Sequence, residues 1–438
     1  MPITPIPRDI VQNCLVQSGL KKAGMASIRE LNRLVNAIET ASGTPFIRME
    51  MGVPGLDPPQ VAVEAEIAAL KRGVGSKYPP FDGIPELKNQ ISRFVKNFLD
   101  VDIRPAGCLP TVGSMQGTFL AMMMTGRRTR GKDHLLFIDP GFPVNKKQAQ
   151  VLGLAYERFD IYEHRGHKLA AKLETYLSTG KFGALIYSTP NNPAWICLTP
   201  DELQIIGEMC TRYDITALED LAYFGMDFRK DYSRPGRPPF IPSVANYTDN
   251  YILLISSSKS FTLAGQRIGM LAVSDHLWDS RGDNLEPFFG TDRFGYAMVF
   301  GGMYTLSSGV SHSAQWGLTE LLKAVNAGSY NFVEEVKIYG ERAKVMKKIF
   351  TDNGFHLVYD RDGDQPLADG FYFTVAYPGL AGPDLVEELL YYGISAISLA
   401  TTGSDRHEGI RACVSFTGPE KYDLLKKRLE RFHADHRP

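Results

Sequence analysis

Residues 251–270 read YILLISSSKSFTLAGQRIGM, and this stretch places a lysine shortly after an apolar run. The five residues from Tyr251 to Ile255 predict a short buried strand, which three serines follow. In an open sheet covered by helices, ligands bind in the crevice at the carboxyl ends of the strands. The side chain of Lys259 is therefore expected to point toward a ligand. Taken alone, a loop lysine beside serines is more often solvated, so its function depends on the rest of the chain.

The middle of the chain alternates between strand and helix patterns. Four further runs, at 134–140, 153–160, 182–190 and 215–223, are apolar or mixed and are mostly separated by segments with helical periodicity. Strands that alternate with helices form βαβ units and a largely parallel sheet. The predicted fold class is therefore α/β.

Both ends of the chain differ from this alternating middle. Residues 8–41 have a helical pattern, and the final hundred residues contain short runs that predict a smaller sheet closed by a helix. A Gly- and Asp-bearing segment at about 276–293 interrupts the alternation. Because 438 residues exceed the size at which a single core keeps growing, we expect one large and one smaller domain.

Composition excludes several classes of function. The chain has 48 Lys and Arg against 49 Asp and Glu, a net charge of -1, so it lacks the electrostatic footprint of a protein that binds nucleic acid or an anionic membrane. The sequence has no signal-peptide pattern and no apolar run that could span a membrane, which predicts a cytoplasmic location. The scattered cysteines predict free thiols, and their spacing predicts no metal site. They are Cys14, Cys108, Cys197, Cys210 and Cys413.

The residues around Lys259 have the spacing of a known signature. The pattern S-x-S-K-x-x-x-x-x-G-x-R-[IV]-G belongs to pyridoxal-phosphate (PLP) aminotransferases of the aspartate aminotransferase fold. The residues that resemble it are Ser256, Ser258, Lys259, Gly265, Arg267, Ile268 and Gly269. Other motifs of that family follow in the same order, over about residues 45–415. They are Gly52 in GVPGLDPP, Tyr78 in KYPPFDGIPEL, Gly113 to Met115 in GSMQG, Asn192 in STPNNPAWICLTP, Asp220 and Tyr223 in ITALEDLAY, and Arg411 in GIRACVSF.

Each of these motifs has an ordinary structural explanation when it stands alone, such as a helix cap or an Asn-Pro turn. Their shared order and spacing make the chain similar to the fold-type I, class I/II aminotransferases. The resemblance implies a large PLP-binding domain over residues 56–328, with a mostly parallel seven-stranded sheet between helices. It also implies a smaller α+β domain, formed by the N-terminal segment 1–55 and the C-terminal segment 329–438.

The resemblance implies a set of contacts to the ring of PLP. Lys259 would form the Schiff base, and Asp220 would pair with the pyridine nitrogen so that the ring serves as an electron sink. Tyr223 and Asn192 would hydrogen-bond the 3′ oxygen of the cofactor. Phe142, in DPGFP, would stack on the ring.

The phosphate of the cofactor would be held at a helix N-terminus, where free backbone N–H groups favour anions. The resemblance assigns these N–H groups to Gly113, Ser114 and Met115. It assigns side-chain contacts to Ser256 and Arg267, and the guanidinium suits a bidentate contact with phosphate.

Substrate and subunit contacts are also implied. Arg411 would clamp the α-carboxylate of an amino acid, beside Asn192, and Gly52 would let the backbone approach the substrate. Tyr78 would reach the phosphate of a neighbouring subunit, which implies a homodimer. Arg293 lies in about the region where dicarboxylate-specific members carry a second arginine, although the segment before it makes that assignment a hypothesis.

One motif departs from the family's pattern. Ala194 and Trp195 stand where Thr and Gly are usual, so the resemblance still assigns Asn192 but does not define the shape of its loop.

The implied activity is ping-pong transamination of an L-amino acid with a 2-oxo acid through a Lys259 Schiff base. Another fold-type I PLP enzyme, such as a C–S β-lyase or a cyclopropane-forming synthase, remains an alternative because it would share these residues. A sensor that merely binds PLP is a further alternative. No partner among nucleic acids or membranes is expected.

Overall fold

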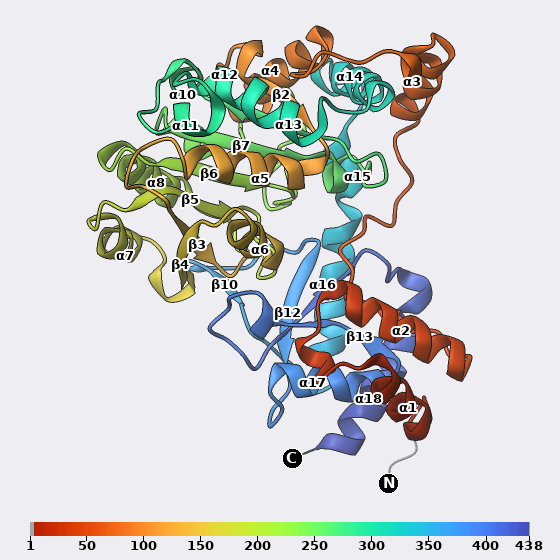
Figure 1. Cartoon of the computed structure of the whole chain (residues 1–438). Helices are drawn as coiled ribbons and strands as arrows, with labels where there is room; N and C mark the ends of the chain where they lie inside the picture. Colours follow the sequence, from red (N-terminus) through yellow and green to blue (C-terminus); the bar gives the residue numbers. More distant parts are fainter. Residues whose placement is uncertain (1–3, 438) are drawn as a thin grey trace.

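The computed structural model describes residues 4–437. A seven-stranded sheet lies at the centre of its upper part in Figure 1. The strands, in spatial order, are β2 (Cys108–Thr111), β8 (Gly269–Val273), β7 (Tyr251–Ser256), β6 (Thr216–Leu221), β5 (Phe182–Ser188), β3 (His134–Asp139) and β4 (Ala155–Asp160). Strand β8 is antiparallel to both of its neighbours, β2 and β7, and all other adjacent strands are parallel. The predicted α/β class with a mostly parallel seven-stranded sheet is confirmed.

The sequence of β7 is apolar without interruption because both faces of this strand are buried. Ile252 and Leu254 belong to one hydrophobic core, whereas Tyr251, Leu253 and Ile255 belong to another. Successive side chains of a strand point to opposite faces, so a sheet that is covered on both faces needs apolar residues at every position. Lys259 follows immediately where this burial ends, in the short helix α9 (Ser257–Ser260).

Helices cover both faces of the sheet. The core on one face contains residues of α5 (Gly113–Thr125) and α6 (Pro143–Val151). The core on the other face contains residues of α4 (Pro85–Leu99), α7 (Lys168–Leu177), α8 (Pro200–Arg212) and α14 (His312–Asn326). Helix α3 (Gln60–Lys71) packs on α14 (Figure 1). The segment at 276–293 contains part of α10 (Asp275–Asp279) and all of α11 (Glu286–Phe289).

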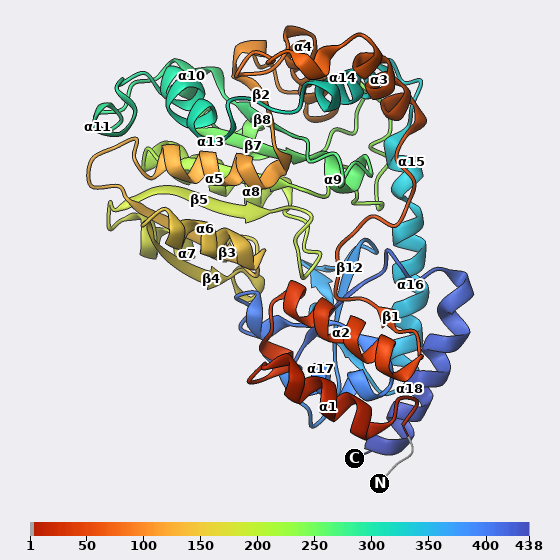
Figure 2. The same ribbon diagram turned by 45° about the vertical axis from the view of Figure 1, so that its right-hand side comes forward.

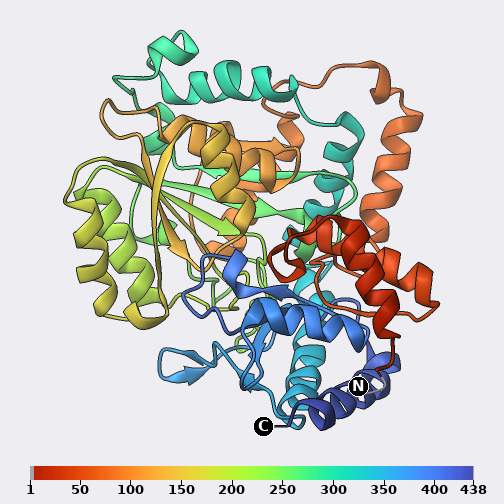
Figure 3. The same ribbon diagram turned by 60° about the horizontal axis from the view of Figure 1, so that its bottom comes forward.

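The lower part of the molecule combines the two ends of the chain. Residues of α1 (Arg8–Ser18) and α2 (Ile28–Ser42) share one hydrophobic core with residues of α16 (Ile338–Thr351), α17 (Gly382–Tyr391) and α18 (Tyr422–His436). Figure 2 shows both termini at this end, and in Figure 3 the red N-terminal helices lie beside the blue C-terminal elements. The short parallel pair β1 (Ile47–Arg48) and β13 (Ile394–Ser395) also joins the two segments.

A small antiparallel sheet lies within this lower part. Its order is β14 (Ile397–Ser398), β15 (Ile410–Cys413), β12 (Tyr372–Ala376) and β9 (His356–Leu357). A separate hairpin pairs β10 (Arg361–Asp362) with β11 (Gln365–Pro366). In β12 and β15, Thr374 pairs with Arg411, which brings both strands to the edge of the site described below.

The expectation of one helical segment over residues 8–41 was wrong in its middle. Helix α1 ends at Gly19, whose backbone is left-handed with φ 68°. Glycine adopts this conformation without steric cost, which makes it a common helix stop. Ser27 then starts α2 through a capping box with Glu30.

No helix among residues 4–437 combines the length and the apolar character needed to cross a membrane.

Candidate active site

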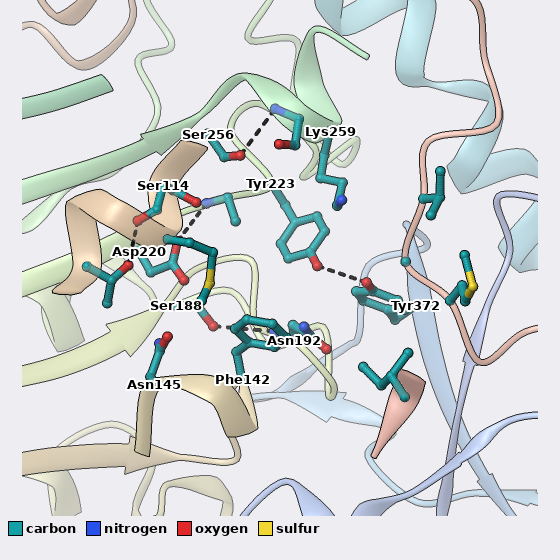
Figure 4. Close-up of a pocket in the computed structure, with 18 of the residues that line it drawn as sticks. Ser114, Phe142, Asn145, Ser188, Asn192, Asp220, Tyr223, Ser256, Lys259 and Tyr372 are labelled. Carbon is teal, nitrogen blue, oxygen red and sulfur yellow. Dashed lines mark hydrogen bonds between the residues drawn. The ribbon is translucent and has the colours of Figure 1, made fainter. Parts of the chain in front are cut away.

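A cavity of about 740 Å³ lies where the carboxyl ends of β5, β6 and β7 meet the N-terminus of α5 and the lower part of the chain. The structure brings most of the predicted site residues into its wall (Figure 4). They are Gly52, Ser114, Met115, Phe142, Asn192, Asp220, Tyr223, Ser256, Lys259, Arg267 and Arg411. Residues that are far apart in sequence therefore form one site.

Burial changes the chemistry of Lys259. It lowers the pKa of the amine to about 8; the charge of Cys413 opposes this shift in part, and Arg267 and Arg411 add smaller effects that lower the pKa. The hydroxyl of Ser256 caps the short helix by accepting a hydrogen bond of 3.1 Å from the N–H of Ser258. The amine is thus partly unprotonated near neutral pH, which is the form that a nucleophile or a general base requires.

Asp220 lies at the end of β6, where few groups stabilise the negative charge of its carboxylate. It accepts a hydrogen bond of 3.1 Å from the N–H of Ala222, and within residues 4–437 it forms no ion pair. Burial therefore raises the pKa of its carboxyl to about 7. A cationic N–H donor, such as a protonated pyridine, would supply the partner that Asp220 lacks, so this residue fits PLP.

The other end of the cavity suits a phosphate. Gly113 begins α5 with φ 63°, and a Cβ atom there would come within 2.6 Å of Nη2 of Arg267. The missing side chain therefore lets the guanidinium lie against the helix N-terminus. Ser114 and Met115 line the cavity from the same turn, whose backbone N–H groups and dipole favour anions.

Arg411 is the cation on the opposite side, and its side chain is buried. Its Nη1 donates to Oδ1 of Asn192 over 3.2 Å, and its Nη2 donates to the backbone oxygen of Glu50. Its buried Nε has no hydrogen-bond partner within residues 4–437. A buried guanidinium without a carboxylate partner fits an anionic ligand, because an unpaired buried charge is costly.

Sequence reasoning missed Tyr372. Its hydroxyl accepts a hydrogen bond of 2.9 Å from the hydroxyl of Tyr223, as Figure 4 shows. Its ring lies 4.3 Å from the guanidinium carbon of Arg411, close enough for a cation–π contact. A Cβ atom on Gly52 would lie 2.0 Å from the hydroxyl oxygen of Tyr372. The only available signal was its place in FYFTVAY, a run that reads as an ordinary strand.

Trp195, which stands where the family usually has Gly, packs its side chain beneath the loop that carries Asn192. Trp195 has φ 65° and its side chain is buried. Its ring lies 5.2 Å from that of Tyr223 and fills the space above Gly370, where a Cβ atom would collide with the indole. The indole thus supports the back of Tyr223, while Asn192 still reaches the cavity.

Tyr78 and Arg293 lie elsewhere within the chain. Both line a separate hollow, and Tyr78 is 90% exposed. Exposed aromatic rings surround them, including Tyr296 and Phe300, whose centroids are 4.5 Å apart. The contact of Tyr78 with a neighbouring subunit and the role of Arg293 stay predictions.

Comparisons with known proteins agree with this geometry. The family described as aminotransferase class I and II matches residues 44–420. A probable aspartate aminotransferase of Methanocaldococcus jannaschii is 26% identical over 263 residues, which cover 60% of this chain and 64% of that protein. A probable aspartate/prephenate aminotransferase of Aquifex aeolicus is 27% identical over 309 residues, which cover 69% of this chain and 70% of that protein.

A solved structure shares the fold. A double mutant of aspartate aminotransferase from Thermus thermophilus superposes with a TM-score of 0.73 at 18% identity, and the match covers 93% of this chain and 96% of that one. The family match spans most of the chain, and its sequence relatives are named aminotransferases. The chain therefore belongs to the class I and II aminotransferases, a family of PLP-dependent enzymes.

Proposed function

We propose that this enzyme transfers the amino group of an L-amino acid to a 2-oxo acid by a ping-pong mechanism, with Lys259 as the amine that carries PLP. One observation supports this most strongly: a lysine with a lowered pKa, a buried uncompensated aspartate and a buried uncompensated arginine line the same cavity. These groups match the amine, ring and carboxylate contacts that transamination needs.

Several residues would hold the cofactor. Asp220 would pair with the ring nitrogen, and Phe142 would stack on the ring. Tyr223 and Asn192 would donate to the 3′ oxygen. The phosphate would lie between the α5 N-terminus, at Gly113, Ser114 and Met115, and the side chains of Ser256 and Arg267. When bound, PLP supplies an aldehyde for the amino group and a ring that withdraws electrons from the substrate's Cα.

The chain's own residues would bind the substrate and move its proton. Arg411, oriented by Asn192, would hold the α-carboxylate and so fix the Cα–H bond relative to Lys259. The unprotonated Nζ of Lys259 would accept the Cα proton and later return it to the cofactor side. Buried Asp220 would keep a positive charge on the ring nitrogen and so stabilise the negative charge that develops.

The names of the relatives give little information about the side chain of the substrate. Their names mention aspartate and prephenate, and each of these compounds carries two carboxylates. Arg293 would meet such a group only if it reached the site of another subunit, because it lies outside the cavity of its own chain. The proposed substrate is therefore an L-amino acid, whatever its side chain.

A homodimer is part of the proposal. The hollow beside Tyr78 and Arg293 carries exposed rings of Tyr296 and Phe300, and apolar aromatic patches of this kind are typical of subunit interfaces. Tyr78 would then complete the phosphate site of the second subunit. The division into segments 1–55, 56–328 and 329–438 is proposed from the resemblance, and the cytoplasmic location stays a prediction from the sequence.

The experiment that tests the function separates transfer from elimination. The holoenzyme is mixed with single amino acids, with and without a 2-oxo acid, and the absorbance of the cofactor is followed. Transamination predicts a spectral change with the amino acid alone and continued turnover only after the 2-oxo acid is added. Steady release of ammonia and pyruvate without any acceptor would instead indicate a C–S β-lyase.

A further inference from the structure

Helix α2 brings two arginines into the wall of the active-site cavity. Arg29 and Arg33 line it together with Ile28 and Asn32 of the same helix. Residues four apart lie on the same face of a helix, one turn from each other. Both arginines are exposed, and both contribute to the wall of the cavity. We refer to Arg29 and Arg33 as the arginine pair.

The guanidinium groups of the arginine pair have no hydrogen-bond or ion-pair partner among the described residues. Within residues 4–437 neither side chain forms an ion pair or a hydrogen bond, whereas the neighbouring Arg48 contacts Glu39 over 3.1 Å and Glu50 over 3.0 Å. Like charges one turn apart repel and weaken a helix. The charge of Arg33 helps to lower the pKa of Glu30 on the same helix, after the larger effect of the Ser27 hydrogen bonds, but the two side chains form no ion pair. A ligand is therefore the direct partner that the position of the pair offers.

The charges of the cavity support this reading. Of the described residues that line it, Asp220 is the only carboxylate, against five cationic side chains. The proposed function uses Lys259 as the reacting amine, Arg267 for phosphate and Arg411 for the α-carboxylate. No role in that function is left for the arginine pair. The positive charge of the cavity therefore exceeds the negative charge that PLP and an amino acid with a neutral side chain would bring.

Hydrogen bonds fix the arginine pair relative to the carboxylate clamp. Asn32, which lies between the two arginines in sequence, donates to Sδ of Met51 over 2.7 Å and to Oε1 of Glu50 over 3.5 Å. The carboxylate of Glu50 accepts from the hydroxyl of Ser395. Its backbone oxygen accepts from Nη2 of Arg411. Helix α2 is thereby tied to the residue that would hold the α-carboxylate.

We propose that the arginine pair is a second anion subsite, which binds a carboxylate or phosphate at the distal end of the substrate's side chain while Arg411 holds the α-carboxylate. Guanidinium groups bind both anions through paired N–H donors. This inference rests on the proposed function and names its substrate class: amino acids and 2-oxo acids with a second negative charge. Both arginines line the cavity of the chain that carries Lys259, whereas Arg293 lies outside that cavity.

Binding of unreactive acids tests the subsite without turnover. The dissociation constants of succinate, 3-phosphonopropionate and butyrate are measured by calorimetry on the holoenzyme. We expect one or both of the doubly charged acids to bind more tightly than butyrate. The variant Arg29→Ala/Arg33→Ala should weaken that binding roughly tenfold or more and leave butyrate unchanged, because charge-assisted hydrogen bonds are lost. High salt should reduce the same difference, since the arginines are exposed.

A matched control removes two charges outside the cavity. Lys21→Ala/Lys71→Ala changes net charge equally, at exposed positions that do not line the cavity, and should bind all three acids like the wild type. The subsite is overturned if neither doubly charged acid binds better than butyrate to the wild type. It is also overturned if the Arg29→Ala/Arg33→Ala variant keeps the wild-type preference, in particular if Arg293→Ala abolishes it.

Kinetics separate this inference from the proposed function. With aspartate, glutamate and O-phosphoserine as donors, the arginine-pair variant should lose kcat/KM at least tenfold for the donor that the wild type prefers, while alanine is unaffected. Equal losses with alanine would overturn the subsite and leave transamination standing. If instead no amino acid changes the cofactor's absorbance in the wild type, the proposed function fails, and the binding data still decide the subsite.

Discussion

The hydroxyl of Tyr223 donates to the hydroxyl of Tyr372 over 2.9 Å, and this bond joins strand β6's end to strand β12 across the cavity. The ring of Tyr372 also lies against the guanidinium of Arg411. One residue that the motifs did not single out therefore links the proposed ring contact to the proposed carboxylate clamp.

The variant Tyr372→Phe tests this link. In the apoenzyme it leaves the buried hydroxyl of Tyr223 without an acceptor, so we expect unfolding to become easier by about 1–3 kcal/mol. With PLP bound, Tyr223 would donate to the cofactor and the loss should shrink. Thermal unfolding of both forms measures the difference. The control Tyr377→Phe, which removes a bond to Nδ1 of His433 away from the cavity, should cost the same in both forms.

The variant Gly52→Ala should lower activity at least tenfold, because its Cβ would lie 2.0 Å from the hydroxyl oxygen of Tyr372. The double variant Gly52→Ala/Tyr372→Phe removes the colliding atom and should recover much of kcat/KM. The ring carbon behind it would still lie at 3.1 Å, so recovery should be partial. If the double variant were worse than the product of the single effects, the collision would not explain the glycine.

The apoenzyme's stability should depend on pH through Asp220. Burial raises the pKa of its carboxyl to about 7 in the folded protein, from an ordinary value of 3.8 in the unfolded chain. Between these values the unfolded chain has lost the proton that the folded protein keeps, so this residue's contribution to stability falls as pH rises from about 4 to 7. Apoenzyme Asp220→Asn should therefore unfold at a higher temperature than the wild type at pH 8 and show no such gain near pH 4. A gain that is equal at both pH values would contradict the raised pKa.

Hybrid dimers test the proposed contribution of Tyr78. A Lys259→Ala subunit and a Tyr78→Ala subunit each form a defective homodimer, but their hybrid has one site with Lys259 from one subunit and Tyr78 from the other. Random mixing makes half of the dimers hybrids, so roughly a quarter of wild-type activity should return, above the residual activity of Tyr78→Ala itself. No gain after refolding the two variants together would mean that Tyr78 serves its own subunit or none.

Much of the fold could be predicted because its signals are local. The uninterrupted apolar run of β7 and the alternation of strand and helix patterns before it predicted the sheet. They also placed Lys259 at the carboxyl ends of its strands. Asp220 ends a similar strand, so the same rule found it. The break at Gly19 was missed because a short turn hardly disturbs helical periodicity.

Contacts made by distant segments could not be predicted in this way. Tyr372 reaches the cavity because β12 pairs with β15 in a register that no single run encodes. The arginine pair looks like any exposed face of an amphipathic helix until α2 is packed beside the Met51 loop. The motif left the shape of the loop at Trp195 open, and only the structure shows that the indole packs behind Tyr223.

The most direct test of the central claim is to trap the cofactor on the protein. The holoenzyme is reduced with borohydride and digested, and its peptides are examined by mass spectrometry. We predict that the mass of reduced PLP appears on Nζ of Lys259, and that Lys259→Ala carries none and has lost transamination. Attachment to another lysine, or full activity of Lys259→Ala, would contradict the account.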